Sequence, residues 1–320
     1  MHKQFLTLLI DPDGNESLSL KNEICEGDNI SSGILYSSKN TYEIIEGIPR
    51  FVKSDNYSSN FSFQWNRWPR LQFDKENIGR PMQNWTSNMF KKITEFDPNL
   101  MKGKTCIDLG VGSGRFSEIC LNAGAIVVGV DNSNSVSNAK KNLGNSENLL
   151  IVQADILNLP FKSKTFDYAF SIGVLHHTPE RFKAIKNIYS KLKNGGEFSL
   201  SVYEKKSYYD SRPVRFWRYI FRRLRPFLGI FPPLIYSYLI VNIIWHIGKL
   251  SKYITYPLRL FFPMAYLPDK KWSILDTFDS LTPTYQSTHT SFEIYQWLKN
   301  SNFKNIKPTD WGFTSYNAKK

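Results

Sequence analysis

Three glycines and three aspartates combine the residue types and the spacing needed to hold a small ligand at the end of a sheet. Gly110, Gly112 and Gly114 follow an apolar run that ends at Asp108, within the segment TCIDLGVGSGRF that begins at Thr105. Glycine lets the backbone turn tightly and lets a ligand come close. A helix that begins after such a loop offers free N–H groups and the positive end of its dipole. Because a glycine-rich loop alone is a weak signal, the interpretation depends on the residues that follow it.

Two further aspartates end the next two apolar runs. Asp131 closes the run VVGVD, 21 residues after Gly110, where a carboxylate can accept hydrogen bonds from both hydroxyls of a ribose. Asp155 closes the run VQAD, where it can accept from an adenine amino group. Either acid alone could instead cap a helix or lie in a solvated loop. Together, at the carboxyl ends of successive strands, these residues predict a pocket for an adenosine that carries a positively charged tail.

The elements that must position these residues are short apolar runs alternating with helical patterns between residues 104 and 203, which predict a parallel sheet with right-handed crossovers. The expected strands are 105–109, 125–130, 149–152, 168–172 and 197–203, with helices near 113–123, 134–142 and 180–192. The predicted divisions are a β-rich unit (1–53), a connector and leading helix (54–103), the ligand-binding core (104–203), a basic helical cap insertion (204–270), and a C-terminal helix with closing strands (271–320).

The core resembles the class I S-adenosylmethionine-dependent methyltransferases. The resemblance lies in residues 108–114, 127–131, 153–161 (QADILNLPF), 166–180 (FDYAFSIGVLHHTPE) and 192–203 (LKNGGEFSLSVY). It implies an α/β fold with a Rossmann-like, seven-stranded, mostly parallel sheet, helices on both faces, and S-adenosylmethionine as cofactor over the first strand. It also implies roles for single residues: Asp108, Gly110, Gly112 and Gly114 at the methionine end, Asp131 and Asn132 at the ribose, Asp155 and Ile156 at the adenine, and Ser171 beside the transferred methyl group.

The flanks of the core are similar to a bacterial subgroup in which a small zinc-ribbon-like unit precedes the catalytic domain. The matching segments are GIPRFV at 47–52, FSFQWN at 61–66, DTFD at 276–279 and Pro283-Thr-Tyr285. Where such ribbons carry CxxC pairs, this chain has DPDG at 11–14 and LYSS at 35–38. Zinc needs four Cys- or His-type ligands, so we expect a degenerate ribbon and no metal.

The acceptor of the methyl group should lie under the connector and the cap insertion. His176 is the candidate general base, since an ordinary histidine pKa near 6.5 suits that role, although both it and His177 could instead cap a helix or pack beneath the cofactor. Gln64 and Trp65 are candidate lid contacts, and His177 and Tyr203 are further candidates for the acceptor pocket.

The basic charge is concentrated in the insertion. The chain carries a formal charge of +13, and residues 203–260 hold eleven basic and two acidic side chains. Arginines recur every three or four residues from Arg212 to Arg225, which predicts a basic amphipathic helix, with Arg215 and Arg218 as candidate substrate contacts. The uncharged stretch 227–248 is interpreted as a buried or interfacial helix, because its part after Pro233 is shorter than a membrane span. Residues 212–248 therefore leave two readings open: peripheral membrane contact or a solvated face.

Taken together, the sequence predicts an S-adenosylmethionine-dependent methyltransferase that acts on a small anionic or amphiphilic acceptor, such as a lipid, a quinone precursor or a saccharide intermediate. A non-catalytic scaffold that binds the cofactor is the alternative, and a nicotinamide-dependent oxidoreductase is disfavoured because Arg115 stands at the third glycine of that motif. A nucleic-acid acceptor is disfavoured, since no Asn-Pro-Pro-Tyr-type segment follows Phe170. The sparse cysteines, Cys25, Cys106 and Cys120, favour a cytoplasmic protein, peripheral at the membrane if the basic helix binds lipid.

Overall fold

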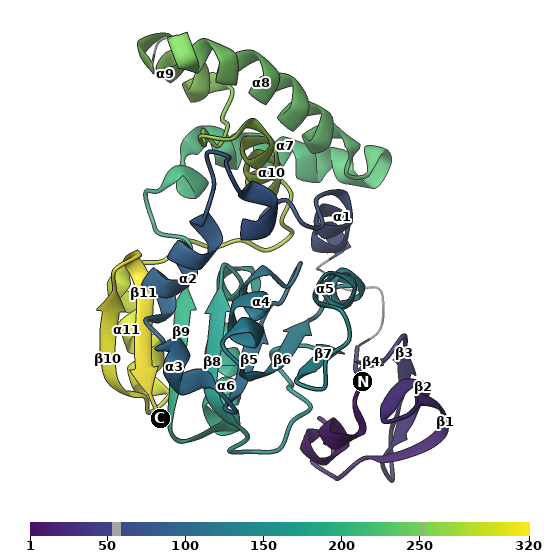
Figure 1. The fold of residues 1–320 in the computed structure, drawn as a ribbon. Helices are drawn as coiled ribbons and strands as arrows, with labels where there is room; N and C mark the ends of the chain where they lie inside the picture. Colours follow the sequence, from purple (N-terminus) through teal and green to yellow (C-terminus); the bar gives the residue numbers. More distant parts are fainter. Residues whose placement is uncertain (53–58, 251) are drawn as a thin grey trace.

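The computed structural model describes residues 1–52, 59–250 and 252–320, and it places all the described strands in one sheet. The strand order is β1-β2-β3-β4-β7-β6-β5-β8-β9-β11-β10 (Figure 1). Its middle consists of β5 (Thr105–Leu109), β6 (Ile126–Asp131), β7 (Leu149–Gln153), β8 (Phe166–Ile172) and β9 (Leu192–Ser201), which are all parallel to one another. These strands carry continuous apolar runs, as expected for parallel strands that are buried on both faces.

The alternation of side chains along these strands produces two separate cores. On one face Ile107, Val128 and Leu150 pack with α6 (Arg181–Lys191) and α11 (Ser291–Asn300). On the other face Cys106 and Val127 pack with α2 (Trp85–Thr94), α4 (Arg115–Asn122) and α5 (Ser135–Leu143). Successive residues of a strand point to opposite faces, so helices cover both faces, as expected from the sequence. A short helix, α3 (Pro98–Met101), leads into β5.

The expected strand count and strand directions need correction. The sheet has eleven strands rather than seven, because the N-terminal unit adds β1 (Ser19–Glu26), β2 (Asn29–Tyr36), β3 (Thr41–Ile45) and β4 (Ile48–Arg50) beyond β7. These strands pair antiparallel with one another, as do β11 (Gly312–Lys319) with β9 and β10 (Lys304–Thr309) with β11. The sheet is therefore mixed: parallel in the middle and antiparallel at both ends. Pairing between the N-terminal unit and β7 is not local in sequence, so periodicity could not indicate it.

Two segments of the N-terminal unit, 11–14 and 35–38, meet around a carboxylate. Asp11 is fully buried and accepts hydrogen bonds from Ser37 Oγ at 2.5 Å, Asn40 Nδ2 at 3.0 Å and Tyr42 Oη at 2.8 Å. Burial alone would raise the pKa of Asp11, but these hydrogen bonds outweigh it and hold the pKa well below its usual range. Among the described residues, no group of three or more His, Cys, Asp or Glu side chains could hold a metal ion.

The region between β9 and α11 consists of helices that lie beyond the carboxyl ends of the parallel strands (Figure 1). These are α7 (Arg212–Leu228), α8 (Phe231–Leu250), α9 (Lys252–Phe261) and α10 (Lys270–Leu281). Within the described chain, α8 alone is long and apolar enough to cross a membrane, and 39% of it is buried in the structure. α1 (Ser59–Arg67) packs on α10 through Phe63 and Phe278, whose ring centroids lie 5.8 Å apart.

Candidate functional site

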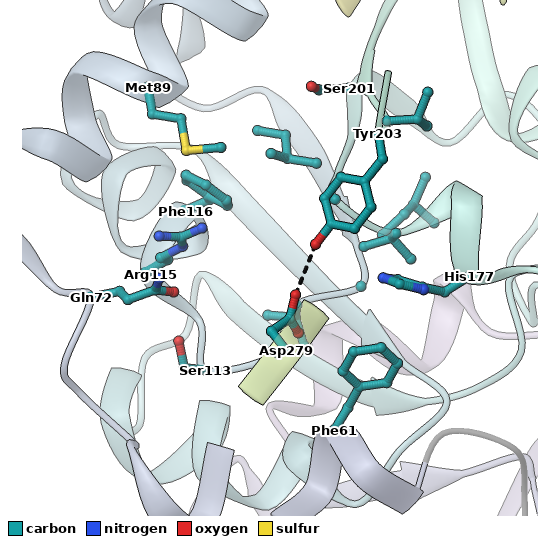
Figure 2. A pocket seen from close by; sticks show the side chains of 18 of the residues that line it. Phe61, Gln72, Met89, Ser113, Arg115, Phe116, His177, Ser201, Tyr203 and Asp279 are labelled. Carbon is teal, nitrogen blue, oxygen red and sulfur yellow. Dashed lines mark hydrogen bonds between the residues drawn. The ribbon is translucent and has the colours of Figure 1, made fainter. Parts of the chain in front are cut away.

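A cavity of about 440 Å³ lies over the carboxyl ends of the parallel strands, where ligands of open α/β sheets bind (Figure 2). Its floor comes from the ends of β5, β6, β8 and β9 and the loops that follow them, and its roof from α1 and α10. The volume is within the usual range for small-molecule sites. It brings together residues that are more than 200 positions apart in sequence.

The glycine-rich loop forms one wall of this cavity. Gly112 has a backbone φ of +53°, donates its N–H to Asp131 Oδ2 at 3.0 Å, and lies so close to α1 that a Cβ there would be 2.9 Å from Trp65 Nε1. At Gly110, with φ +92°, a Cβ would be 2.2 Å from Val174. Gly110 and Gly112 line the cavity, whereas Gly114 is the N-cap of α4 and stands behind it. The loop is therefore glycine-rich because its backbone is left-handed and tightly packed.

Asp131, Asn132 and Ile156, which the sequence analysis assigned to the cofactor, line the cavity. Asp131 Oδ1 also accepts from the backbone N–H of Ser133 at 2.8 Å and from its hydroxyl at 2.7 Å. Burial raises the pKa of Asp131, and the Ser133 hydrogen bonds oppose this rise. The carboxylate at the end of β6 is thus fixed in orientation while one side of it faces the cavity.

Three other residues assigned to the cofactor lie outside the cavity lining. Asp108 is buried beneath the loop and accepts from Ser117 Oγ at 2.8 Å; burial raises its pKa to about 7. Asp155 accepts from the N–H of Leu157 at 2.9 Å. Ser171 is fully buried and donates to the carbonyl oxygen of Leu109. Their contacts position the loop and the strand ends, while Ala154 and Ile156 rather than Asp155 face the cavity.

Five buried polar atoms around the cavity have no hydrogen-bond partner in the described part of the chain. They are Gln64 Oε1, Gln72 Oε1, Ser113 Oγ, Arg115 Nη1 and Ser207 Oγ. Buried polar groups are normally hydrogen-bonded, so these atoms indicate a ligand with its own donors and acceptors. Gln72 and Arg115 both line the cavity, and Arg115 directly follows Gly114 of the glycine loop. The sequence did not lead us to assign either residue to the site. The available signal was Arg115, which stands where the dinucleotide-binding pattern has its third glycine.

The histidines are arranged differently from the expectation of a base at His176. His176 is buried outside the cavity lining, neither ring nitrogen has a partner among the described residues, and burial holds its pKa well below the usual range. Its ring packs against Tyr203, with centroids 3.8 Å apart. His177 does line the cavity, but its Nδ1 lies 2.8 Å from the carbonyl oxygen of Tyr285 and burial lowers its pKa. Both rings are therefore neutral packing groups in this structure.

Two carboxylates that sequence reasoning did not assign to the site enter it from α10. Asp276 and Asp279 are one helical turn apart and both line the cavity. Asp279 Oδ2 accepts from the Tyr203 hydroxyl at 2.8 Å (Figure 2). Burial and repulsion by Asp279 raise the pKa of Asp276 to about 7, and attraction to Arg115 opposes this. One part of the cavity wall thus consists of the glycine loop and Asp131, which the sequence predicted to hold the cofactor. Another part is acidic and comes from α10 in the C-terminal part of the chain.

The candidate acceptor contacts divide into two groups. Gln64, Trp65, His177 and Tyr203 line the cavity together. Arg215 and Arg218 do not: Arg215 is exposed, with Nη1 3.8 Å from Asp210, and Arg218 donates to the backbone carbonyls of Ser280 and Tyr209. Arg218 therefore ties α7 to the end of α10.

The comparison with known families agrees with this geometry. Residues 107–200, less than half of the chain, match the family model described as "Methyltransferase domain". Residues 107–200 are a methyltransferase domain. The cofactor of this methyltransferase domain is S-adenosylmethionine. The residues present fit it: glycines that admit a close ligand, Asp131 at the second strand, and unpartnered Gln72 and Arg115 beside the loop.

Outside this domain the likeness is limited. The chain is 36% identical over 108 residues to the tRNA (carboxymethyluridine(34)-5-O)-methyltransferase of Saccharomyces cerevisiae, covering 33% of this chain and 37% of that protein. It is 36% identical over 104 residues to the ubiquinone biosynthesis O-methyltransferase of Coxiella burnetii, covering 32% and 44%. A solved S-adenosylmethionine-dependent methyltransferase from Listeria monocytogenes, described as putative in its title, is 26% identical, with a TM-score of 0.34 over 37% of this chain and 55% of that one. The chain thus spans less than half the length of these two curated relatives.

Proposed function

We propose that the whole chain is an S-adenosylmethionine-dependent methyltransferase with a small-molecule acceptor. The observation that carries the proposal is the single cavity in which Gly112 and Asp131 of the methyltransferase domain face Trp65 of α1 and Asp279 of α10. When bound, the cofactor supplies a methyl group on a positively charged sulfur. The residues of this chain hold and orient the two reactants and exclude water, which is the main requirement for such a displacement.

We propose an amphiphilic acceptor. Of the acceptors expected from the sequence, lipids and quinone precursors belong to this class. Aromatic side chains from several elements line the cavity, with Phe61, Trp65, Tyr209 and Trp272 among them. The anionic alternative has less support, because Arg215 and Arg218 lie away from the cavity and its lining is rich in carboxylates. Apolar walls with a few polar groups are typical of sites for such molecules.

We further propose a cytoplasmic protein that contacts membranes peripherally through α7 and α8. Phe231, Ile235, Leu239 and Ile243 recur every four residues on α8 and are each more than half exposed. Arg212, Arg215, Arg222 and Arg223 are exposed on the preceding helix. An apolar row beside basic side chains suits an anionic lipid surface.

Calorimetry with S-adenosylmethionine tests the activity proposal at its first step. The protein should bind S-adenosylmethionine and should not bind NAD. Asp131→Ala should weaken binding by about 1–3 kcal/mol, the scale for losing a hydrogen bond in which one group is charged. Asp310→Ala, which removes an exposed carboxylate outside the cavity, is the matched control and should leave affinity unchanged. Binding of NAD without a response to S-adenosylmethionine would refute the proposal.

Sedimentation with vesicles tests the membrane proposal. The chain should bind phosphatidylserine vesicles at low salt and dissociate as salt rises, since basic residues near the surface contribute about 1 kcal/mol each. Replacing Arg212, Arg215 and Arg222 by Gln should reduce binding, while Arg218 is kept because it holds α10. Equal sedimentation of the variant and the native chain, or none at all, would contradict the proposal.

A further inference from the structure

The cavity is acidic although the chain as a whole is basic. Among the described residues that line it are four carboxylates, those of Asp131, Glu204, Asp276 and Asp279, and one guanidinium, that of Arg115. His177, also in the lining, is kept neutral because burial lowers its pKa. A chain with a formal charge of +13 therefore surrounds a site whose own charge is negative. Such an arrangement attracts cations and repels anions at close range.

The acidic side chains are concentrated on α10. Asp279 is held by the Tyr203 hydroxyl at 2.8 Å, whereas Asp276 has no hydrogen-bond partner within the described chain. Arg115, whose pKa burial lowers to about 10, does not come within 4.0 Å of a carboxylate oxygen in the described structure. Asp276 therefore faces the cavity without a direct ion pair among the described residues, although Arg115 attracts it at longer range, and a positively charged ligand group could pair with it there.

A second, independent set of atoms points to the same kind of ligand. Gln64 is 2% exposed and lines the cavity, and its Oε1 is without a donor among the described residues. The α1 helix that carries it packs directly on α10 through Phe63 and Phe278. An amide oxygen and two carboxylates are all acceptors, so the group they bind must supply several N–H or O–H donors.

Aromatic rings complete this part of the cavity. Tyr209 is stacked on Tyr203, with ring centroids 3.7 Å apart and planes 6° from parallel, and both rings line the cavity with Phe61, Trp65 and Trp272. Aromatic faces attract cations, and most strongly where water is excluded. Carboxylates, an amide oxygen and aromatic faces together match an organic ammonium group better than a neutral or an anionic one.

We propose that the acceptor is an amphiphilic amine whose protonated nitrogen is bound by Asp276 and Asp279 of α10. This inference rests on the proposed function, because it assigns the acceptor end of the same cavity. The amine supplies three donors and the charge that the two carboxylates lack, while its apolar part lies against the aromatic walls. Asp279, in addition, keeps Tyr203 in place.

The test uses the native chain saturated with S-adenosylhomocysteine and three probes that differ only in their terminal polar group: 2-phenylethylamine, 2-phenylethanol and 3-phenylpropionate. Calorimetry at pH 8 should show the amine binding at least about tenfold more tightly than the alcohol, and the carboxylate most weakly, because hydrogen bonds between charged groups are the stronger ones. Binding of S-adenosylhomocysteine is measured first. If it fails, the proposed function fails; if it succeeds and the three probes bind alike or the carboxylate binds best, this inference alone is overturned.

Variants of Asp276 test whether this residue is responsible for the preference for the amine. Asp276→Asn should abolish the preference for the amine, Asp276→Glu should retain it, and Asp310→Asn should behave as the native chain. The affinity for the amine should also fall between pH 8 and pH 6 in the native chain, because Asp276, whose pKa is raised to about 7, becomes protonated there. The charged or titratable groups that face it are Asp279, Arg115, Tyr203, Tyr208 and Tyr209. An amine preference that survives in Asp276→Asn, with the same pH dependence, would refute the assignment.

Discussion

Replacing Gly112 by alanine should test the two reasons for a glycine in the cofactor loop, which are its left-handed backbone and the close approach of Trp65. Gly112 has φ +53°, and a Cβ there would lie 2.9 Å from Trp65 Nε1 and 3.1 Å from Cε2 of the same ring. The left-handed backbone alone costs an alanine about 1–2 kcal/mol. The clash is an additional cost, because real Cβ atoms essentially never approach another atom so closely and the indole must move.

Gly79 offers a matched control. Its φ is +71°, similar to that of Gly112, but a Cβ there would meet nothing within 4 Å. Gly79→Ala should therefore lower the free energy of unfolding by about 1–2 kcal/mol and leave cofactor affinity unchanged. Gly112→Ala should lower the free energy of unfolding by more than this. It should also weaken S-adenosylhomocysteine binding about tenfold or more, which is about 1.4 kcal/mol, because the clash displaces Trp65 from the cavity wall and strains the Gly112 backbone, whose N–H holds Asp131.

Urea unfolding and calorimetry measure the two quantities. A second substitution, Trp65→Phe, should recover part of the lost affinity in the Gly112→Ala background, because the smaller ring gives the new methyl group room. Such non-additivity is expected only of residues in contact. The reasoning would be wrong if Gly112→Ala and Gly79→Ala had the same effect on both quantities, or if Trp65→Phe gave no recovery.

Two further predictions concern buried carboxylates. Asp108 has a pKa raised to about 7 in the folded chain, against about 4 when unfolded, so its ionisation should lower the free energy of unfolding as pH rises from about 4 to about 7. Asp108→Asn should reduce that decline in urea titrations without cofactor, leaving the part due to Asp131, Asp155 and Asp276, whose pKa values burial also raises; an unchanged slope would count against this account. Asp11 has the opposite sign, because its pKa is depressed: its stabilisation is present above about pH 4 and is lost as pH falls. Asp11→Ala should lower the free energy of unfolding by about 1–3 kcal/mol for each buried donor left unsatisfied. Asp28→Ala, at an exposed position, should change it by no more than about 0.5 kcal/mol. Equal stability of the two variants would exclude a stabilising role of Asp11.

The parts of the site that the sequence could predict are those encoded by local order. Gly110, Gly112 and Asp131 face the cavity because a strand, a loop and a helix follow one another in a fixed geometry. The sequence predicts both Asp155 and Ile156 at the adenine; in the structure Ile156 lines the cavity, whereas Asp155 accepts from the Leu157 N–H and lies outside the lining. Which of two neighbouring side chains faces the cavity depends on the conformation of the loop. The spacing of residues in the sequence does not determine it.

The acidic wall could not be predicted in the same way. Asp276 and Asp279 are about 150 residues from Asp131, and only the packing of α10 over the strand ends brings them together. A helix with two carboxylates three positions apart is indistinguishable, in sequence alone, from a solvated surface. His176 shows a different limit: its position after the fourth strand was compatible with a base or with a packing role, and in the structure it packs against Tyr203 outside the cavity lining.

The join between β4 and β7 has a consequence for any attempt to shorten this protein. Arg50 pairs with Gln153 across the join, Phe51 donates to the Gln153 carbonyl at 2.8 Å, and Leu9 bridges to Phe161 nearby. Met1, Phe5 and Leu35 belong to the same apolar core as Val128 and Leu150. A chain trimmed to begin at residue 104 would retain the matched family region but would expose a bare edge strand and an apolar face. Unprotected edges of this kind pair with other chains, so the trimmed protein should self-associate, whereas in the described structure the N-terminal unit covers this edge of the sheet.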